Sequence, residues 1–208
     1  MSLSLVRACV AAPLACQPDD NFAALNSKPL RIACVGLPGS GKSTVGRQLA
    51  RRMACRFIDT DHVLEQRMGC SIREFFEREG ESAFRDMEEA VIDELSLDGD
   101  YVLSTGGGAV LRPSNRRHLH ERTTTVYLHS APEEVFRRLR HDLNRPLLQV
   151  ADPLQRLKEL YLLRDPLYRE TAHLVIETGR PSVASLVTTI MLALKLEPAT
   201  PPAAPPAA

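Results

Sequence analysis

The sequence predicts an α/β fold in which a five-stranded parallel sheet lies between helices. Three observations predict it. Short, mostly apolar runs recur along the chain, as in strands that are covered on both faces. Helical segments separate these runs, which favours right-handed crossovers between parallel strands. The first run leads directly into the glycine-rich segment Gly36 to Thr44 (GLPGSGKST) and then into a helix.

Each predicted strand is short and ends near a polar or glycine-rich turn. Residues 30–35 (LRIACV) are apolar except for Arg31, as expected for a strand buried on both faces. The five predicted strands are, in order, residues 30–35 (LRIACV), 56–59 (RFID), 101–104 (YVLS), 125–128 (TVYL) and 173–177 (HLVIE).

The segments between the strands predict helices. Residues 43–53 follow the glycine-rich loop, and a helix from about residue 61 to 68 follows the second strand. Ser71 and Glu74 form a capping box that begins another helix, which Gly80 interrupts before apolar residues continue at helical spacing. A later helix begins at Pro132, because proline suits the first turn. The last predicted helix spans residues 181–195.

The polar stretch RHDLNRPLLQVADP stands between two helical segments and contains two prolines. Such a stretch is a candidate mobile flap over a ligand site. We therefore predict a mobile lid at about residues 140–152.

Chain length and the composition of the ends predict one folded domain. The 208 residues suffice for one α/β domain and are few for two. The predicted domain spans residues 28–196. Residues 1–27 are predicted to be a flexible extension, which weakly resembles a secretory signal but has no convincing cleavage site. Residues 197–208 are rich in proline and alanine and predict a disordered tail.

Composition limits the class of partner. The 26 basic and 26 acidic residues balance, so no net positive field attracts nucleic acid or an anionic membrane. No run reaches the roughly 18 apolar residues that a membrane span needs. Five cysteines without metal-ligand spacing indicate reduced thiols in a cytosolic protein. We expect a cytoplasmic monomer that binds small molecules, with neither nucleic acid nor membrane as partner.

GLPGSGKST fits the phosphate-loop pattern GxxxxGK[ST]. Its glycines allow backbone amides to surround phosphate oxygens, and the following helix directs its positive end toward them. Lys42 can bridge the β and γ phosphates, and the Ser43 hydroxyl can bind Mg²⁺. With a strand before and a helix after, the motif predicts a three-layer P-loop NTPase fold. The predicted nucleotide-binding residues of the loop are Gly39, Ser40, Gly41, Lys42, Ser43 and Thr44.

Two acids, Asp59 and Asp61, follow the second strand in the sequence IDTD. Ligands of doubly wound sheets bind outside the carboxyl ends of the strands, so both acids are expected near the phosphates. On an extended segment their side chains would point the same way. One carboxylate near Mg²⁺ and another near an acceptor hydroxyl would serve phosphoryl transfer to an alcohol. The alternative is that Asp61 only caps the next helix.

The order of the later motifs resembles the shikimate kinase family. After the loop and the acid pair come AFRDMEE, a triple glycine that follows a strand, RPLL and PLYRE. The similarity spans about residues 30–194. The resemblance implies an enzyme that transfers the γ-phosphate of ATP to the 3-hydroxyl of shikimate, in chorismate and aromatic amino-acid biosynthesis. Mg²⁺ would be the cofactor and ATP the co-substrate.

The resemblance implies roles for residues on the shikimate side. Asp61 would hold the acceptor hydroxyl and is a possible general base. Arg85 and Arg169 would bind the substrate carboxylate, since a guanidinium offers charge and two parallel hydrogen bonds. Glu88 would pair with Arg85 and orient it. The glycine turn, where bare backbone permits close approach of the substrate ring, consists of Gly106, Gly107 and Gly108.

On the nucleotide side, the resemblance implies that Ser43 and Asp59 bind Mg²⁺ and that Lys42 is catalytic. Arg145 would be a catalytic lid residue that neutralises the transferring phosphate and helps to exclude water. Arg138 would stack on adenine, although Arg137 or Arg140 could take its place. The segment ETGRP near Thr178 resembles the family's adenine-side loop but is shorter than in some members.

Two other functions compete with this interpretation. A nucleoside monophosphate or gluconate kinase shares the loop and the flap, but the acid pair and triple glycine match the shikimate pattern better. A P-loop switch or assembly ATPase would usually have an apolar strand ending in an acid, whereas the candidate strand YVLS ends in TGGG.

Overall fold

The computed structural model describes residues 29–97, 99–139 and 152–198. Within them, parallel strands form a five-stranded sheet in the order β2-β3-β1-β4-β5. The strands are β1 (Arg31–Val35), β2 (Arg56–Asp59), β3 (Tyr101–Ser104), β4 (Thr124–His129) and β5 (Leu174–Glu177). The predicted α/β architecture and its five strands are confirmed, with strand ends differing by no more than one residue.

Helices connect the strands. The predicted helices at α1, α2, α3, α5 and α7 are present, and α6 is the helical segment expected after the flap. Helix α4 was not predicted because its sequence, PSNRRHLHER, is almost entirely polar. The helices are α1 (Lys42–Arg52), α2 (Thr60–Met68), α3 (Ile72–Leu95), α4 (Pro113–Arg122), α5 (Pro132–Leu139), α6 (Pro153–Thr171) and α7 (Val183–Ala193), with a short 3₁₀ helix η1 (Ala109–Leu111).

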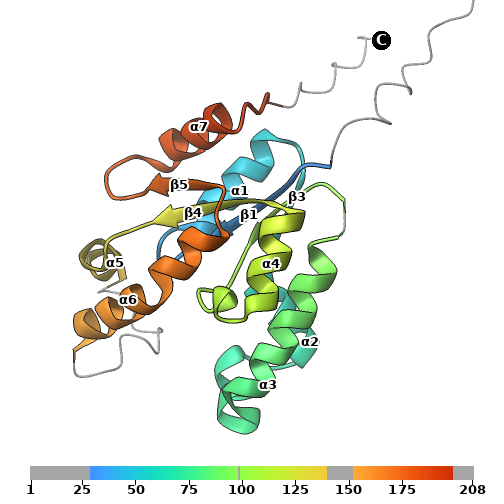
Figure 1. Ribbon diagram of the computed structural model, residues 1–208, viewed down its shortest axis with the longest axis vertical. Helices are drawn as coiled ribbons and strands as arrows, with labels where there is room; N and C mark the ends of the chain where they lie inside the picture. Colours follow the sequence, from blue (N-terminus) through green and yellow to red (C-terminus); the bar gives the residue numbers. More distant parts are fainter. Residues whose placement is uncertain (1–28, 98, 140–151, 199–208) are drawn as a thin grey trace, which may run out of the picture.

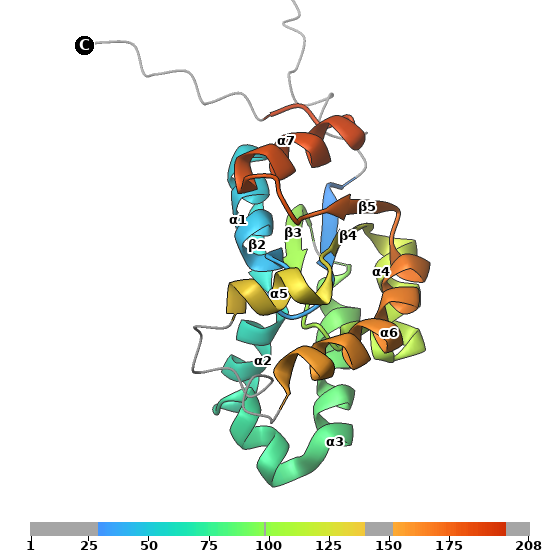
Figure 2. The ribbon, with the colours of Figure 1, turned by 90° about the vertical axis from the view of Figure 1, so that its left-hand side faces the viewer.

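The sheet is the middle of three layers. Helices α1 and α7 cover one face, and α4 and α6 cover the other (Figures 1 and 2). Alternate residues of each strand enter opposite cores, as the pleat requires. Ile32 and Cys34 of β1 pack toward α1 and α7, whereas Ala33 and Val35 pack toward α6. Burial on both faces explains the nearly continuous apolar sequence of β1.

Helices α2 and α3 extend from one end of the molecule in both views (Figures 1 and 2). Their predicted capping box is present. The Ser71 hydroxyl accepts the Glu74 N–H at 3.2 Å, and the Glu74 carboxylate accepts the Ser71 N–H at 2.8 Å. Gly80 breaks α3 with φ 83° and ψ 173°, a conformation almost restricted to glycine. The second half of α3 thus turns back toward the sheet and carries Arg85 and Glu88.

Several predictions concern residues outside the described ranges. These are the extension at residues 1–27, nearly all of the lid at 140–152 with Arg140 and Arg145, and most of the tail at 197–208. Among the described residues, no helix is both long and apolar enough to cross a membrane.

Candidate active site

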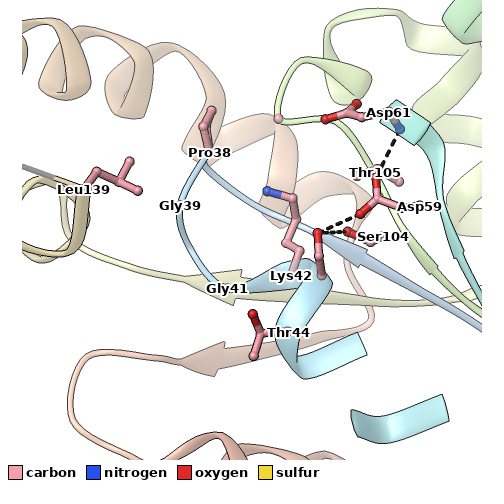
Figure 3. A pocket seen from close by; sticks show the side chains of 12 residues that line it. Pro38, Gly39, Gly41, Lys42, Thr44, Asp59, Asp61, Ser104, Thr105 and Leu139 are labelled. Carbon is pink, nitrogen blue, oxygen red and sulfur yellow. Dashed lines mark hydrogen bonds between the residues drawn. The ribbon is translucent and has the colours of Figure 1, made fainter. Parts of the chain in front are cut away.

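A pocket of about 350 Å³ lies where β1, β2 and β3 end. Figure 3 shows Lys42 between Pro38 of the phosphate loop and the acids Asp59 and Asp61. The pocket's position agrees with the rule that ligands of open α/β sheets bind at the carboxyl ends of the strands. The lining residues include Pro38, Gly39, Gly41, Lys42, Ser43, Thr44, Asp59, Asp61, Ser104, Thr105, Gly107 and Leu139.

The phosphate loop has the backbone that its sequence predicts. Gly39 and Gly41 have φ values of 81° and 96°, which residues other than glycine rarely adopt. Lys42 donates to the Gly36 carbonyl at 3.0 Å and the Leu37 carbonyl at 2.9 Å, so its ammonium lies over the loop. Ser40 does not line the pocket; it is buried, and its N–H donates to the Leu37 carbonyl at 3.1 Å.

Three oxygen-bearing side chains meet beside the loop. The Ser43 hydroxyl donates to Asp59 Oδ2 at 2.7 Å and lies 3.1 Å from the Ser104 hydroxyl (Figure 3). Hydroxyl and carboxylate oxygens are the ligands that Mg²⁺ prefers, and Mg²⁺ in nucleotide sites often takes only one or two carboxylates. These residues therefore fit a magnesium ion that the nucleotide phosphates also bind. Ser104 was not among the predicted site residues.

The structure corrects the expected backbone of the acid pair. Helix α2 already begins at Thr60, so Asp61 is not on an extended segment and does not cap the helix. Asp59 is the cap, and its Oδ1 accepts the Asp61 N–H at 3.1 Å. Both carboxylates nevertheless line the pocket. Asp59 thus uses one oxygen for the helix and the other for Ser43.

Asp61 is in an environment that disfavours its charge. Burial raises the pKa of Asp61 above its ordinary value, and the Asp59 carboxylate raises it further, while Lys42 and Arg85 oppose the shift. A carboxylate with a raised pKa is a better proton acceptor than an exposed one. Asp61 therefore lines the pocket with the raised pKa that a general base would need.

Each glycine of the triple-glycine turn lies too close to a different neighbouring residue to carry a side chain. A β-carbon on Gly106 would lie 2.7 Å from Asp61 Oδ1, and one on Gly107 would lie 2.7 Å from the Pro38 ring. A β-carbon on Gly108 would collide with the Arg85 guanidinium. None of the three has a positive φ, so lack of space and not backbone strain requires glycine here.

Arg85 lies against this turn and is held by acids. Its Nη1 donates to Glu88 Oε2 at 2.6 Å, and its Nη2 donates to Glu81 Oε1 at 3.1 Å. The expected pairing of Glu88 with Arg85 is confirmed. Glu88 is only 1% exposed, and burial raises its pKa although Arg85 opposes the shift. Among the described residues, nothing hydrogen-bonds to Glu88 Oε1.

Arg169 does not reach the glycine turn. Its guanidinium donates to Asp165 at 2.8 Å and lies 5.9 Å from the centre of the Tyr127 ring, with the side chain 48% exposed. Instead Arg164 Nη1 donates to the Gly107 carbonyl at 3.2 Å. Five residues along an α-helix rotate a side chain by about 140°, so the two arginines face different directions. The structure thus favours Arg164 over the predicted Arg169 as the second guanidinium at this site.

Arg138 precedes the pocket residue Leu139 in α5 and reaches the ends of β4 and β5. It donates to the Ser130 hydroxyl at 3.4 Å and to the carbonyl oxygen of Thr178. Ser130 and Thr178 directly follow β4 and β5, so this arginine joins the ends of two neighbouring strands. This is the region in which ETGRP was expected to contact adenine.

The pocket thus joins a phosphate loop, an acid pair and an arginine-lined glycine turn. The sequence model of the shikimate kinase family matches residues 38–195. The chain belongs to the shikimate kinase family. The match includes the whole pocket from Pro38 onward, as well as Arg164.

Individual shikimate kinases are similar over nearly their full length. The shikimate kinase of Paracidovorax citrulli (strain AAC00-1) is 60% identical over 176 residues, covering 83% of this chain and 96% of that protein. That of Ralstonia nicotianae is 54% identical over 162 residues, covering 78% and 85%. The structure of shikimate kinase from Acinetobacter baumannii in complex with shikimate has a TM-score of 0.77 at 44% identity, covering 83% and 97% of the two chains.

A gluconokinase from Sinorhizobium meliloti 1021 has a TM-score of 0.51 at 19% identity, covering 80% of this chain and 92% of that chain. At that identity the likeness concerns the fold alone. The phosphate loop and flap by themselves were therefore compatible with a gluconate kinase as well. The match to the shikimate kinase family model distinguishes between the two families.

Sequence reasoning missed Arg164, although a signal was present. Arg164 and Tyr168 are four residues apart on α6, and both donate to the Gly107 carbonyl, Tyr168 at 2.5 Å. Residues at this spacing share a helix face. With Leu160, which is also buried, they form a stripe at successive intervals of four. That spacing could have indicated Arg164 as the arginine on the inner face.

Proposed function

We propose that this chain transfers the γ-phosphate of ATP to the 3-hydroxyl of shikimate, giving shikimate 3-phosphate and ADP. One observation carries the proposal: the phosphate loop, Asp61 and Gly107 of the glycine turn line one pocket, and Arg85 and Arg164 lie against that turn. A β-carbon on Gly107 would lie 2.7 Å from the Pro38 ring of the loop, so the two half-sites are directly adjacent. The family's place in chorismate and aromatic amino-acid biosynthesis follows as part of this proposal.

Asp61 would orient the acceptor hydroxyl and receive its proton. The hydroxyl oxygen forms a bond to the γ-phosphorus, the bond from that phosphorus to the β–γ bridging oxygen breaks, and ADP leaves with the electron pair. Lys42 would place its positive charge beside the phosphates during this step. Its hydrogen bonds include two to uncharged carbonyls, whose place phosphate oxygens can take.

Arg85 and Arg164 would bind the substrate carboxylate. Their guanidinium groups flank the glycine turn, Arg85 at Gly108 and Arg164 at the Gly107 carbonyl. Arg164 Nε is buried without a hydrogen-bond partner among the described residues, as is Glu88 Oε1. A buried donor and acceptor without partners are costly unless a ligand or water satisfies them. A small acid with several hydroxyls can satisfy both.

Mg²⁺ would be held by Ser43 and Asp59 together with the nucleotide phosphates. When bound, the ion neutralises phosphate charge. The Ser43 hydroxyl would turn from Asp59 to the ion, and the Asp59 carboxylate keeps its contact with the first turn of α2. Among the described residues, no cluster of three or more His, Cys, Asp or Glu side chains could hold a metal ion. The fit is thus to a nucleotide-bound Mg²⁺.

The remaining nucleotide contacts are assigned by position. Arg138 would contact adenine, since it joins the ends of β4 and β5 beside the phosphate loop. Arg145, in the lid at residues 140–152, would close over the transferring phosphate. We also propose that the protein acts as a cytoplasmic monomer without nucleic-acid or membrane partners, in keeping with its balanced charge.

Measurement of ADP release tests the function. The protein is given ATP, Mg²⁺ and one acceptor from a panel of shikimate, gluconate, AMP, CMP and none. Strong release with shikimate alone is the expected result. Release with another acceptor would agree with phosphate binding by the loop but would reject shikimate carboxylate binding by Arg85 and Arg164. No stimulation by any acceptor would favour a nucleotide-dependent switch.

A further inference from the structure

Two side chains of helix α6 donate hydrogen bonds to the same backbone atom of the glycine turn, the Gly107 carbonyl oxygen. The Tyr168 hydroxyl donates to it at 2.5 Å and Arg164 Nη1 donates at 3.2 Å. Tyr168 is fully buried, and its ring packs against Tyr127 with the ring centres 4.9 Å apart. A side chain that is enclosed in this way has little freedom, so its hydroxyl is held in place.

The orientation of this carbonyl determines the orientation of the next N–H. Every peptide bond among the described residues is trans. In a trans peptide unit, the Gly107 carbonyl and the Gly108 N–H point in opposite directions. Because Tyr168 and Arg164 hold the carbonyl toward α6, the Gly108 N–H is directed away from α6. Gly108 itself lies against the Arg85 guanidinium.

We propose that Tyr168 is a positioning residue for shikimate: its hydroxyl fixes the Gly107–Gly108 peptide so that the Gly108 N–H and Arg85 together present donors to the substrate. The inference rests on the proposed function, which it deepens by adding a residue that does not contact the substrate. Arg164 also donates to the Gly107 carbonyl, but it would bind the substrate directly as well. A change at Tyr168 therefore tests the positioning of the turn without removing a substrate contact.

Other features of the turn agree with a fixed backbone. The Gly106 N–H donates to the buried Thr60 hydroxyl at 3.0 Å, so α2 holds one side of the turn while α6 holds the other. Burial raises the pKa of Tyr168 above its usual range, which keeps the hydroxyl protonated and able to donate at neutral pH. Glycines have the largest backbone freedom of any residue, so a turn of three needs such external contacts to keep one conformation.

The test is Tyr168→Phe, which removes the hydroxyl and keeps the ring. We expect the KM for shikimate to rise about three- to tenfold, the effect of losing one hydrogen bond to a buried group. The KM for ATP and kcat should each stay within twofold, because the phosphate loop and Asp61 are unchanged. Kinetics are measured well below the unfolding temperature of each protein.

Tyr127→Phe is the matched control. Tyr127 is the other fully buried tyrosine of the pair, and its hydroxyl donates to Asp165 at 2.9 Å and not to the turn. It should lose a comparable amount of stability while its KM for shikimate stays within twofold. If both variants raise this KM equally, the effect is one of general packing and the proposal is wrong.

A second variant covers the case in which Tyr168→Phe does not fold. Thr60→Val removes the acceptor for the Gly106 N–H with little change in shape, and it should also raise the KM for shikimate. An unchanged KM in whichever of these variants folds would overturn the proposal. Wild-type protein that does not phosphorylate shikimate would instead reject the proposed function, so the two failures are distinguishable.

Discussion

Asp61, the proposed general base, is a carboxylate whose charge its surroundings disfavour. It lies in the first turn of α2 and, like Asp59, lines the pocket. Burial and the neighbouring carboxylate both disfavour its ionised form. An acid that only supported the fold would more often be exposed or paired with a cation, so this placement favours a chemical role.

Replacing Asp61 by Asn should abolish most phosphoryl transfer. The amide keeps the shape but cannot accept a proton, and kcat should fall about 100- to 10,000-fold. The dissociation constant for ATP should change less than threefold, as measured by equilibrium binding. Turnover near the wild-type rate would remove Asp61 from the catalytic residues.

The same variant should change the pH dependence of stability. The pKa of Asp61 is raised above 3.8 in the folded state, so its contribution to the free energy of unfolding is full below that pH and is lost as pH rises through the folded pKa. Asp61→Asn removes this loss. Urea unfolding of both proteins between pH 4 and 8 should show the variant gaining stability relative to wild type as pH rises. A constant difference would contradict the raised pKa.

At the scale of elements, helix α6 decides which arginine belongs to the site. The residues that it buries include Leu160 and Tyr168, yet Leu162 and Leu163 are 73% and 61% exposed. Apolar residues therefore surround the helix, and its sequence pattern alone does not define the inner face. Packing against the sheet and η1 directs Arg164 toward Gly107 and Arg169 toward Asp165.

Arg164→Lys and Arg169→Lys form a matched pair that tests this orientation. Lysine keeps the charge but loses the two-pronged geometry that binds a carboxylate. The KM for shikimate should rise about tenfold in Arg164→Lys and less than twofold in Arg169→Lys. The reverse ranking would restore Arg169 as the carboxylate ligand and would show that Arg164 only supports the turn.

At the scale of the molecule, the pocket collects residues from most of the chain. Pro38 comes from the phosphate loop, Asp59 from the end of β2, Asp61 from α2 and Leu139 from α5, while Gly107 follows β3. Parallel strands bring their carboxyl ends to the same edge, which is why segments so far apart in sequence meet there. Ligands that contact several of these segments should therefore stabilise the whole domain.

Thermal unfolding with nucleotide tests the magnesium site. ATP with Mg²⁺ at 100 times its dissociation constant should raise the free energy of unfolding by about 2.7 kcal/mol. The same ATP concentration with EDTA should stabilise less, because Ser43 and Asp59 would then face the phosphates without a cation. In Asp59→Asn, the difference between Mg²⁺ and EDTA should shrink. Equal stabilisation of wild type under both conditions would contradict the assignment of Ser43 and Asp59.

The phosphate loop, the five strands and the capping box were predictable because each depends on local physics. Gly39 and Gly41 permit the positive φ values of the loop, and a continuous apolar run defines β1. Helix α4 was not predicted because few of its residues are apolar. The extended backbone predicted at Asp61 was wrong because Asp59 had not been recognised as the cap of α2.

The sequence by itself therefore determined the fold class, the phosphate site and, through the order of its motifs, the family. Only the tertiary structure decided which side chains meet at the glycine turn. Arg164 and Tyr168 are separated from Gly107 by 57 and 61 residues, and their contacts depend on how α6 packs against the sheet. Local spacing predicts which residues share a helix face, but the burial that selects one face comes from the rest of the fold.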